Sequence, residues 1–411
     1  MGVSSVRTAR LLHILLGVLA PSLSLAQSLA QGSAQSAPPE RLIIGYVEVA
    51  GDPRYEPITG YGRLILRHRE HPFVGAQVGL DEAQALGRVA KMQFALERIG
   101  VASPAEVAPA VVQASATRDM HFFIVDAAAE AFKPLADAVR GRDILVFNAT
   151  VPDDTLRRTA CVAEFVHTLP SLAMYMDALV QHFVSRKWSN LLVLEGPLPA
   201  DAVMVKAFER AAQKFGARIV ARAQFKPGND PREREKNDPA LLSAINRDYD
   251  VVFVADSAFE FARQVPYRTV RPRPVAGSID LEPVAWHWTW DHNGAPQVNS
   301  RFEKRSGGRH MESADWASWI AVKMVAQAAL RARSTDFQAQ RKFLLNEGSF
   351  DGNKGLAVSV RHWDHQLRQA ILLAAPYAVV AQAPVEGFLH KTNNLDTLGD
   401  DEPESPCHLD E

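Results

Sequence analysis

The chain has 411 residues, of which 47% are hydrophobic and 22% are charged, and its formal net charge is −2. This composition is typical of a globular protein long enough for two domains. The lack of a basic excess argues against nucleic acid as a partner.

The first 26 residues have the pattern of a secretory signal peptide. Two arginines precede the apolar run at 11–20, which is too short to span a bilayer, and a small-x-small cleavage pattern ends at Ala26. Cleavage after Ala30 or Ala34 is the alternative. We expect export, a flexible lead-in at 27–40 and no transmembrane helix in the mature chain.

From residue 41 onward, short apolar runs alternate with stretches of helical spacing. Strands are predicted at 41–49, 91–99, 121–127, 143–149, 164–169, 190–196, 217–225 and 250–256. Helices are predicted at 73–89, 104–116, 128–141, 171–187, 200–216, 239–249, 312–332 and 337–346. This alternation is typical of parallel sheets with helices on both faces. The elements are too many for one small sheet, so two doubly wound lobes are expected.

Three other stretches have a less regular pattern. The charged stretch 226–239 is predicted to be a loop. Residues 349–381 are predicted to form glycine turns and strands. The acidic end, 396–411, has no periodicity and is expected to lack secondary structure.

Cys161 and Cys407 are the only two cysteines. In an exported protein, two cysteines most simply form one disulfide, which here would tie the acidic tail to the body of the protein. A free structural thiol is one alternative. A nucleophile activated by His167 is another, since sequence separation alone does not show whether thiolate and base are within hydrogen-bonding reach.

Histidines and acids gather in the stretches 67–72, which holds His68 and His71, and 286–292. Imidazole and carboxylate groups can bind a transition metal. Neither stretch has the H-E-x-x-H spacing that places two histidines on one helix face, so no metal site is assigned. No phosphate-binding loop or G-x-S-x-G motif occurs, and no cofactor is expected.

Aromatic residues provide a further signal. Trp286, Trp288 and Trp290 would share one face if the stretch were extended, and could then line a cleft or join the core. Tyr175 lies one turn into the helix predicted at 171–187, where helix packing and ligand contact are both possible roles. Trp288 and Tyr175 are retained as candidate ligand contacts.

Several segments together resemble a known family. They are CVAEFVHTLPSLAMYMDALVQHFVSRKWSNLLVLEG, GAPQVNSRFEKRSGG, DWASWIAVKMVAQA, FDGNKGLAVSVRHWDHQLRQAI, APVEGFLH and LDTLGDDEPESPC. As a set they resemble the periplasmic solute-binding proteins of ABC transporters that accompany pyrroloquinoline-quinone (PQQ)-dependent alcohol dehydrogenases, which are distant relatives of branched-chain amino-acid-binding proteins. The resemblance extends from about residue 41 to Cys407.

The resemblance implies an α/β type I periplasmic-binding fold, with two doubly wound lobes joined by three crossover segments. The crossovers are expected near 165–170, 282–286 and 346–350. Lobe one would then comprise 41–168 plus 285–347, and lobe two 169–284 plus 348–395, followed by the tail at 396–411.

The resemblance also implies a function. We expect a monomeric, non-enzymatic receptor in the periplasm, which captures a small molecule for the permease of an ABC transporter linked to PQQ-dependent alcohol oxidation. A periplasmic sensor or partner protein of that system is the alternative, because the same fold serves both roles. A thiol- or metal-dependent hydrolase is the third hypothesis.

In open α/β sheets, ligands bind beyond the carboxyl ends of the strands. Four loops qualify: 47–55, the loop after 143–149, the HTLPS stretch and the loop after 250–256. The last three loops offer these candidate ligand contacts: Asn148, Thr150, His167, Ser171, Asp256 and Ser257. Amino-acid-binding relatives use a hydroxyl-rich loop where this chain has NATVPDD, which puts an amino-acid ligand in doubt.

Overall fold

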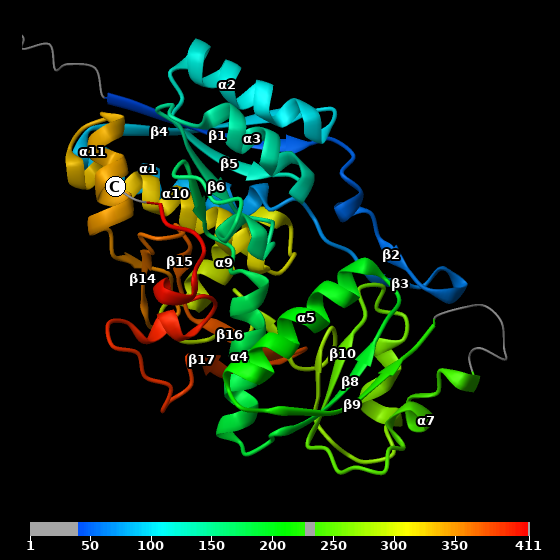
Figure 1. The fold of residues 1–411 in the computed structure, drawn as a ribbon. Coiled ribbons are helices and arrows are strands. Elements are labelled where there is room, and N and C mark those ends of the chain that lie inside the picture. Colours follow the sequence, from blue (N-terminus) through cyan, green and yellow to red (C-terminus); the bar gives the residue numbers. More distant parts are fainter. Residues whose placement is uncertain (1–39, 227–234, 410–411) are drawn as a thin grey trace, which may run out of the picture. The chain divides into compact units, whose positions relative to one another are not determined.

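Two parallel β-sheets form the framework of the fold (Figure 1). The computed structural model describes residues 40–226 and 235–409. The predicted signal peptide, nearly all of the lead-in and the middle of the loop predicted at 226–239 lie outside these residues.

The first sheet has five parallel strands in the order β4-β1-β5-β6-β7. Its middle strands are continuous apolar runs, as expected where helices cover both faces. Glu48 near the end of β1 is in register with Asp126 at the end of β5. The strands are β1 (Glu40–Val49), β4 (Met92–Val101), β5 (Phe122–Asp126), β6 (Leu145–Asn148) and β7 (Phe165–His167).

The second sheet has four parallel strands in the order β11-β10-β8-β9. Its central strand β10 is buried along its whole length. The strands are β8 (Asn190–Glu195), β9 (Arg218–Gln224), β10 (Val251–Ala255) and β11 (Val275–Gly277).

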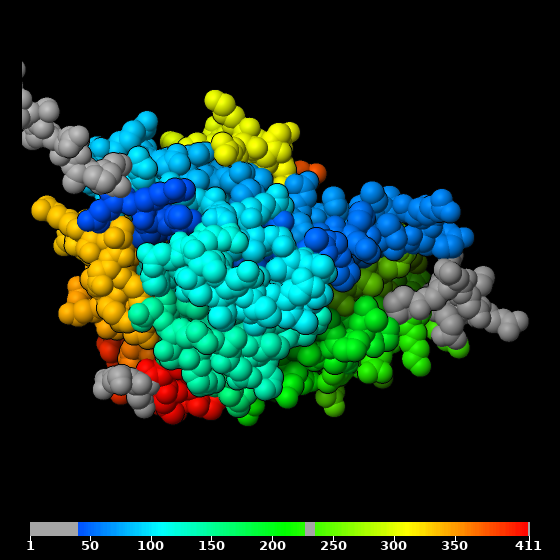
Figure 2. Space-filling model, turned by 90° about the horizontal axis from the view of Figure 1, so that it is seen from above, coloured from blue at the N-terminus to red at the C-terminus, as the bar shows by residue number. Residues whose placement is uncertain are grey.

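Helices cover both faces of the first sheet. The segment that holds α2 and α3 is coloured cyan to teal in Figure 2. The helices on one face are α1 (Phe73–Ala90), α9 (Ala295–Ser306) and α10 (Ser313–Ala332); those on the other are α2 (Val107–Arg118) and α3 (Phe132–Val139). α1 approaches α10 closely, since a Cβ atom added to Gly75 would lie 2.1 Å from the carbonyl oxygen of Asp315. Glycine is therefore required at that crossing.

The second sheet has a similar arrangement. α4 (Leu172–Ser185) and α5 (Pro199–Lys214) pack on one face, and the short helices α7 (Pro239–Ser243) and α8 (Val265–Arg268) lie at the other. Ser171 caps α4, because its hydroxyl accepts a hydrogen bond from the backbone N–H of Met174 at 3.2 Å. Ser171, predicted as a candidate ligand contact, therefore has a structural role at the start of α4.

Three small antiparallel sheets complete the strands that the structure describes. Their strands are β2 (Ile58–Thr59) with β3 (Ile65–Arg67); β12 (Glu282–Val284) with β16 (Ile371–Ala375) and β17 (Ala378–Ala383); and β13 (Phe350–Asp351) with β14 (Ala357–Val360) and β15 (Leu367–Arg368). Helix α11 (Phe337–Lys342) continues into a π-helical turn at 343–347.

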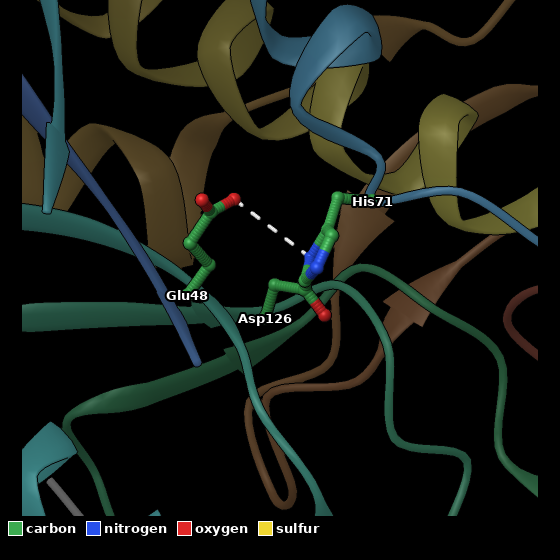
Figure 3. A group of neighbouring side chains, drawn as sticks. All are labelled: Glu48, His71 and Asp126. Atoms are coloured by element: carbon green, nitrogen blue, oxygen red, sulfur yellow. Dashed lines mark hydrogen bonds and ion pairs between the residues drawn. The ribbon is translucent and has the colours of Figure 1, made fainter. Parts of the chain in front are cut away.

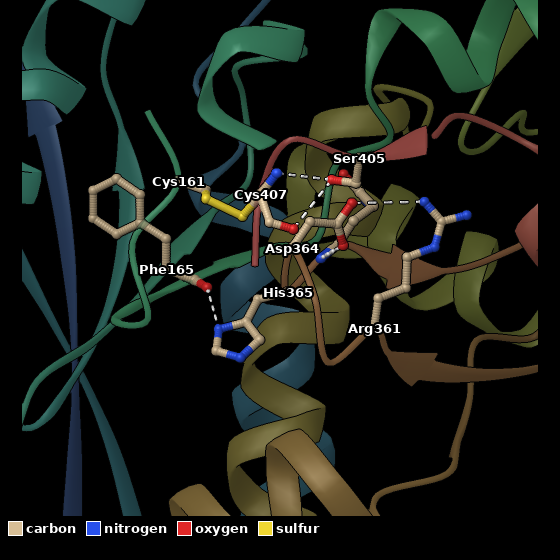
Figure 4. Close-up of a disulfide and its surroundings, with 8 residues drawn as sticks. Cys161, Phe165, Arg361, Asp364, His365, Ser405 and Cys407 are labelled. Atoms are coloured by element: carbon tan, nitrogen blue, oxygen red, sulfur yellow. Dashed lines mark hydrogen bonds and ion pairs between the residues drawn. A yellow bond between two sulfur atoms is a disulfide. The ribbon is translucent and has the colours of Figure 1, made fainter. Parts of the chain in front are cut away.

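The C-terminal tail is ordered by its contacts with the protein core (Figure 4). A disulfide joins Cys161 to Cys407, as predicted, and no free cysteine remains. Arg361 is 1% exposed and donates from Nε to Asp396 Oδ1 at 2.9 Å. The expectation that 396–411 lacks structure is wrong for its described part, because buried ion pairs and short 3-10 turns replace the periodicity that the sequence lacks.

Packing places the third crossover later in the chain than predicted. Phe350, Val358 and Leu367 join the core that covers the first sheet, whereas Ile371 joins the core beside the second. The chain therefore passes from one core to the other at 367–371, and not at 346–350. The remaining lobe limits stay predictions.

In the second half of the chain, the structure differs from the prediction at two helices. The helix predicted at 239–249 ends at Ser243, because the buried Tyr249 folds back and donates its hydroxyl to the Ser243 carbonyl at 3.2 Å. α9 was not predicted, since its sequence is mostly polar.

The tryptophan stretch is a turn and not an extended strand. The N–H of Trp290 donates to the carbonyl of His287 at 3.0 Å. Trp286 is 1% exposed within the first core, whereas the Trp288 ring stacks on His310 with centroids 4.2 Å apart. The predicted aromatic stripe therefore does not form.

Within residues 40–226 and 235–409, no helix combines the length and apolar character needed to cross a membrane.

Candidate functional site

A cluster of charged side chains lies at the carboxyl ends of β1 and β5 (Figure 3). Glu48 and Asp126 are in register on these neighbouring parallel strands, so their side chains project from the same face of the sheet. His71, from the loop before α1, reaches both: its Nδ1 lies 2.7 Å from Asp126 Oδ2 and 3.7 Å from Glu48 Oε2. The fold thus places two acids side by side and a histidine between them.

Asp126 is fully buried and well supplied with hydrogen-bond donors. Its Oδ1 accepts from Tyr55 Oη at 2.5 Å and from Arg54 Nη2 at 2.9 Å. Its Oδ2 accepts from Tyr46 Oη at 3.2 Å, in addition to its contact with His71. Burial raises the pKa of Tyr46 well above its usual value, and the nearby carboxylate adds to this. Tyr46 therefore acts here as a neutral donor.

The loop after β1 brings a further ion pair to the cluster. The guanidinium of Arg54 binds Asp52, with Nη2 2.6 Å from Oδ2, and also reaches Asp126. Burial alone would raise the pKa of Asp52, but hydrogen bonds from Arg54 outweigh it and lower the pKa. On the other side, Arg98 Nε donates to Glu48 Oε1 at 2.7 Å. The cluster therefore contains three carboxylates and two guanidiniums. The carboxylates belong to Glu48, Asp52 and Asp126, and the guanidiniums to Arg54 and Arg98.

The carboxyl ends of the second sheet carry Glu195, Asp256 and Ser278. The Asp256 carboxylate accepts from three backbone N–H groups of its own loop, at 2.8 to 3.1 Å. Burial raises the pKa of Asp256. Ser257 is held by its N–H, which donates to Asp201 Oδ1 at 2.6 Å, while its buried hydroxyl has no hydrogen-bond partner.

The segment between β1 and α1 contacts residues that follow the strands of the second sheet. The N–H of Tyr61 donates to Glu260 Oε2 at 3.0 Å, and Arg67 Nη1 lies 3.2 Å from Glu282 Oε2. The Arg67 guanidinium also lies over the Phe259 ring, 4.8 Å from its centroid. These contacts join the carboxyl-end loops of the two sheets.

Three of the predicted ligand contacts are occupied by local bonds. Asn148 is buried, and its Nδ2 bonds to the Val151 carbonyl at 2.9 Å and approaches His167 Nδ1 at 3.1 Å. His167 is 1% exposed, and burial lowers its pKa well below the usual value. Ser171 caps α4. Their role as ligand contacts stays a prediction.

The other predicted contacts lie in different parts of the fold. Thr150 is half-buried, with Oγ1 3.5 Å from the Ala127 carbonyl. Tyr175 is half-buried on α4, and burial raises its pKa. The ring of Trp288 packs on that of His310. Their contact with a ligand likewise stays a prediction.

Most of the cluster at β1 and β5 was not predicted. The stretch 67–72 holds His71 but was assigned no metal site, and no residue of the predicted ligand loop 47–55 was a candidate contact. Asp126 closes a predicted strand, so the rule that ligands bind beyond strand ends could have identified it. The register that pairs Glu48 with Asp126 was not visible in the sequence.

Part of the chain is similar to a known protein family. Residues 72–268 match the family model described as "Periplasmic binding protein". The matched segment is a little less than half of the chain. The match agrees with the predicted non-enzymatic, solute-binding role. No curated relative matches the chain.

Solved structures share the fold of this chain at low sequence identity. A branched-chain amino acid ABC transporter periplasmic ligand-binding protein from Burkholderia xenovorans LB400 aligns with a TM-score of 0.66 at 13% identity, covering 90% of this chain and all of that one. A leucine-, isoleucine-, valine-, threonine- and alanine-binding protein from Brucella ovis, in a closed conformation, aligns with a TM-score of 0.62 at 12% identity over 82% of this chain and 90% of that one.

A solute-binding protein of an ABC transporter from R. palustris, in complex with benzoate, gives a TM-score of 0.56 at 11% identity over 82% of this chain and 93% of that one. Together, the comparisons confirm the predicted α/β type I periplasmic-binding fold with two parallel-sheet lobes.

Proposed function

We propose that the protein is a periplasmic solute receptor that captures a small molecule between two lobes and delivers it to the permease of an ABC transporter. The observation that carries this proposal is the charged cluster at Glu48, His71 and Asp126, which occupies the carboxyl ends of parallel strands, where open α/β sheets bind their ligands. The names of the structural relatives agree with this role.

The finer part of the proposal concerns the transport system. The resemblance of the sequence to solute-binding proteins that accompany PQQ-dependent alcohol dehydrogenases leads us to propose a role in that system. We further propose that the receptor acts as a monomer, after removal of a signal peptide at residues 1–26.

Ligand capture can be tested with protein recovered from the periplasm of cells grown on alcohols. Native mass spectrometry should detect a bound small molecule, and adding that molecule to stripped protein should make the particle more compact in small-angle X-ray scattering. A ligand that bridges two lobes favours the closed state, because it binds that state more tightly. A scattering profile that ligand leaves unchanged would count against closure.

The site itself can be tested with Arg54→Gln, which removes a cation from the cluster at a partly exposed position. Affinity for the recovered ligand should fall at least about tenfold, as expected for loss of a charge-assisted hydrogen bond. Arg218→Gln is the matched control, because Arg218 is exposed and pairs with Asn190 at the amino end of β8. Equal affinities of both variants and the wild type would place the ligand elsewhere.

A further inference from the structure

We propose that Glu48, His71 and Asp126 form a binding site for a divalent transition-metal ion. One oxygen or nitrogen atom from each of the three side chains lies within 4.8 Å of the other two. This inference deepens the proposed function. Only the role of the metal rests on that function: the metal would be the transported solute itself, or would connect the protein to that solute.

The distances suit a metal with bonds of about 2.1 Å, the length typical of zinc with histidine and carboxylate ligands. Two ligand atoms bound to such an ion are about 3.0–3.4 Å apart, depending on the bond angle. The separations of His71 Nδ1 from Asp126 Oδ2, 2.7 Å, and from Glu48 Oε2, 3.7 Å, lie on either side of this range. Small rotations of the side chains would equalise them.

A second, independent observation is an unpaired oxygen. Glu48 is 9% exposed, and its buried Oε2 has no hydrogen-bond partner. Nδ1 of His71 lies 3.7 Å from this oxygen, too far for a hydrogen bond, and is engaged by Asp126. A carboxylate oxygen buried without a partner is costly, and a metal ion would relieve that cost.

The neighbouring side chains orient the three ligand groups. Arg98 holds Glu48 Oε1 and leaves Oε2 free, while Arg54 and Tyr55 hold Asp126 Oδ1. Hydrogen bonds of this kind to the non-ligating atoms are a regular feature of metal sites. They also compensate two acids that would otherwise repel each other in register.

Charge and access agree with a cation. Three carboxylates, including that of Asp52, face two guanidiniums, so the cluster carries one net negative charge when the histidine is neutral. The side chain of His71 is 25% exposed, whereas that of Asp126 is fully buried. The site therefore opens to solvent on the histidine side, which leaves room for water or a solute as a further ligand.

The donor set selects the class of metal. One imidazole nitrogen and two carboxylate oxygens suit zinc, manganese and related divalent ions. Calcium and magnesium prefer oxygen ligands alone and are expected to bind more weakly.

Isothermal titration of chelator-treated mature protein with Zn²⁺ and with Mn²⁺ tests the site. One ion should bind per chain, and Glu48→Gln and His71→Ala should each weaken binding by about 10- to 100-fold or more. Glu48→Gln retains an oxygen to accept from Arg98, so it should fold normally, which circular dichroism checks. His292→Ala is the control, since His292 is exposed and lies beside Asp291 outside the cluster.

Substitution with Co²⁺ gives an independent readout. Coordination by His71 and the carboxylates should produce visible absorption bands that are lost in Glu48→Gln and kept in His292→Ala. Absence of stoichiometric metal binding, or equal binding by wild type and both cluster variants, would overturn the site. An organic solute recovered from the protein, together with no metal binding, would overturn the metal site alone; failure to find either would also count against the proposed receptor function.

Discussion

Replacing Lys354 by methionine should destabilise the protein through the segments that connect the two sheets. Lys354 is fully buried, and its ammonium lies 3.7 Å from the centroid of the Trp316 ring. It donates to the carbonyls of Ala285 and Ala370 at 3.0 and 2.7 Å, and to Gln369 Oε1 at 2.9 Å. These acceptors belong to two different connecting segments.

The magnitude follows from two opposing effects. Methionine fills a similar volume but leaves three buried oxygens without this donor, and each unpaired acceptor costs about 1–3 kcal/mol. At pH values where Lys354 is charged, its removal also relieves a desolvation cost of several kcal/mol. We expect a net loss of about 2–4 kcal/mol in the free energy of unfolding, because three unpaired acceptors outweigh one relieved charge.

The effect should also depend on pH with a definite sign. Burial lowers the pKa of Lys354 well below its usual value, so the unfolded chain binds this proton more readily than the folded protein. This contribution to wild-type stability rises with pH up to the unfolded pKa of about 10.4, and the variant lacks it. The stability difference should therefore be larger at pH 9 than at pH 7.

Urea unfolding followed by tryptophan fluorescence at both pH values measures the difference. Lys323→Met is the matched control: Lys323 donates to the Asp351 carbonyl at 2.6 Å and lies over the Trp319 ring, but it is accessible to water. It should cost less than about 1 kcal/mol. A Lys354 variant as stable as the wild type, or a stability difference that shrinks between pH 7 and pH 9, would contradict the prediction.

Three further predictions concern stability. Burial lowers the pKa of His365 to about 4, so the unfolded chain takes up this proton more readily than the folded protein as the pH falls. Acidification from pH 7 to pH 4 should therefore lower the free energy of unfolding by about 3 kcal/mol more in the wild type than in His365→Asn. Equal acid sensitivity of the two proteins in urea unfolding would contradict this. Replacing Cys161 and Cys407 together by serine removes a cross-link between residues 246 positions apart, and should lower the free energy of unfolding by about 2–5 kcal/mol. An unchanged melting temperature would be evidence against this. Gly75→Ala should lower the free energy of unfolding by about 1–3 kcal/mol, because its methyl group would meet the backbone of α10. Gly100→Ala is the control, since the space around Gly100 is open. Similar melting temperatures of the two variants would disprove this.

Much of the fold was predictable because its signals are local. Continuous apolar strands such as β5 and β10 alternate with amphipathic helices, and this period alone indicates parallel sheets covered on both faces. The signal-peptide pattern indicated an oxidising compartment, and this led to the correct pairing of Cys161 with Cys407. Elements without a local signal were missed: α9 is mostly polar, and the tail is held by Arg361 and Asp396 through buried charge.

The fold class, the order of most helices and strands, and the single disulfide could be predicted, since each depends on composition or on a period within one segment. The charged cluster could not, because its members are brought together by packing. Glu48, His71 and Asp126 come from three separate segments, and the strand register between β1 and β5 brings two of them together. The same holds for Lys354, because the acceptors that surround it lie up to 69 residues away in the chain. Contacts between distant segments depend on how the helices and strands pack, and no local pattern encodes them.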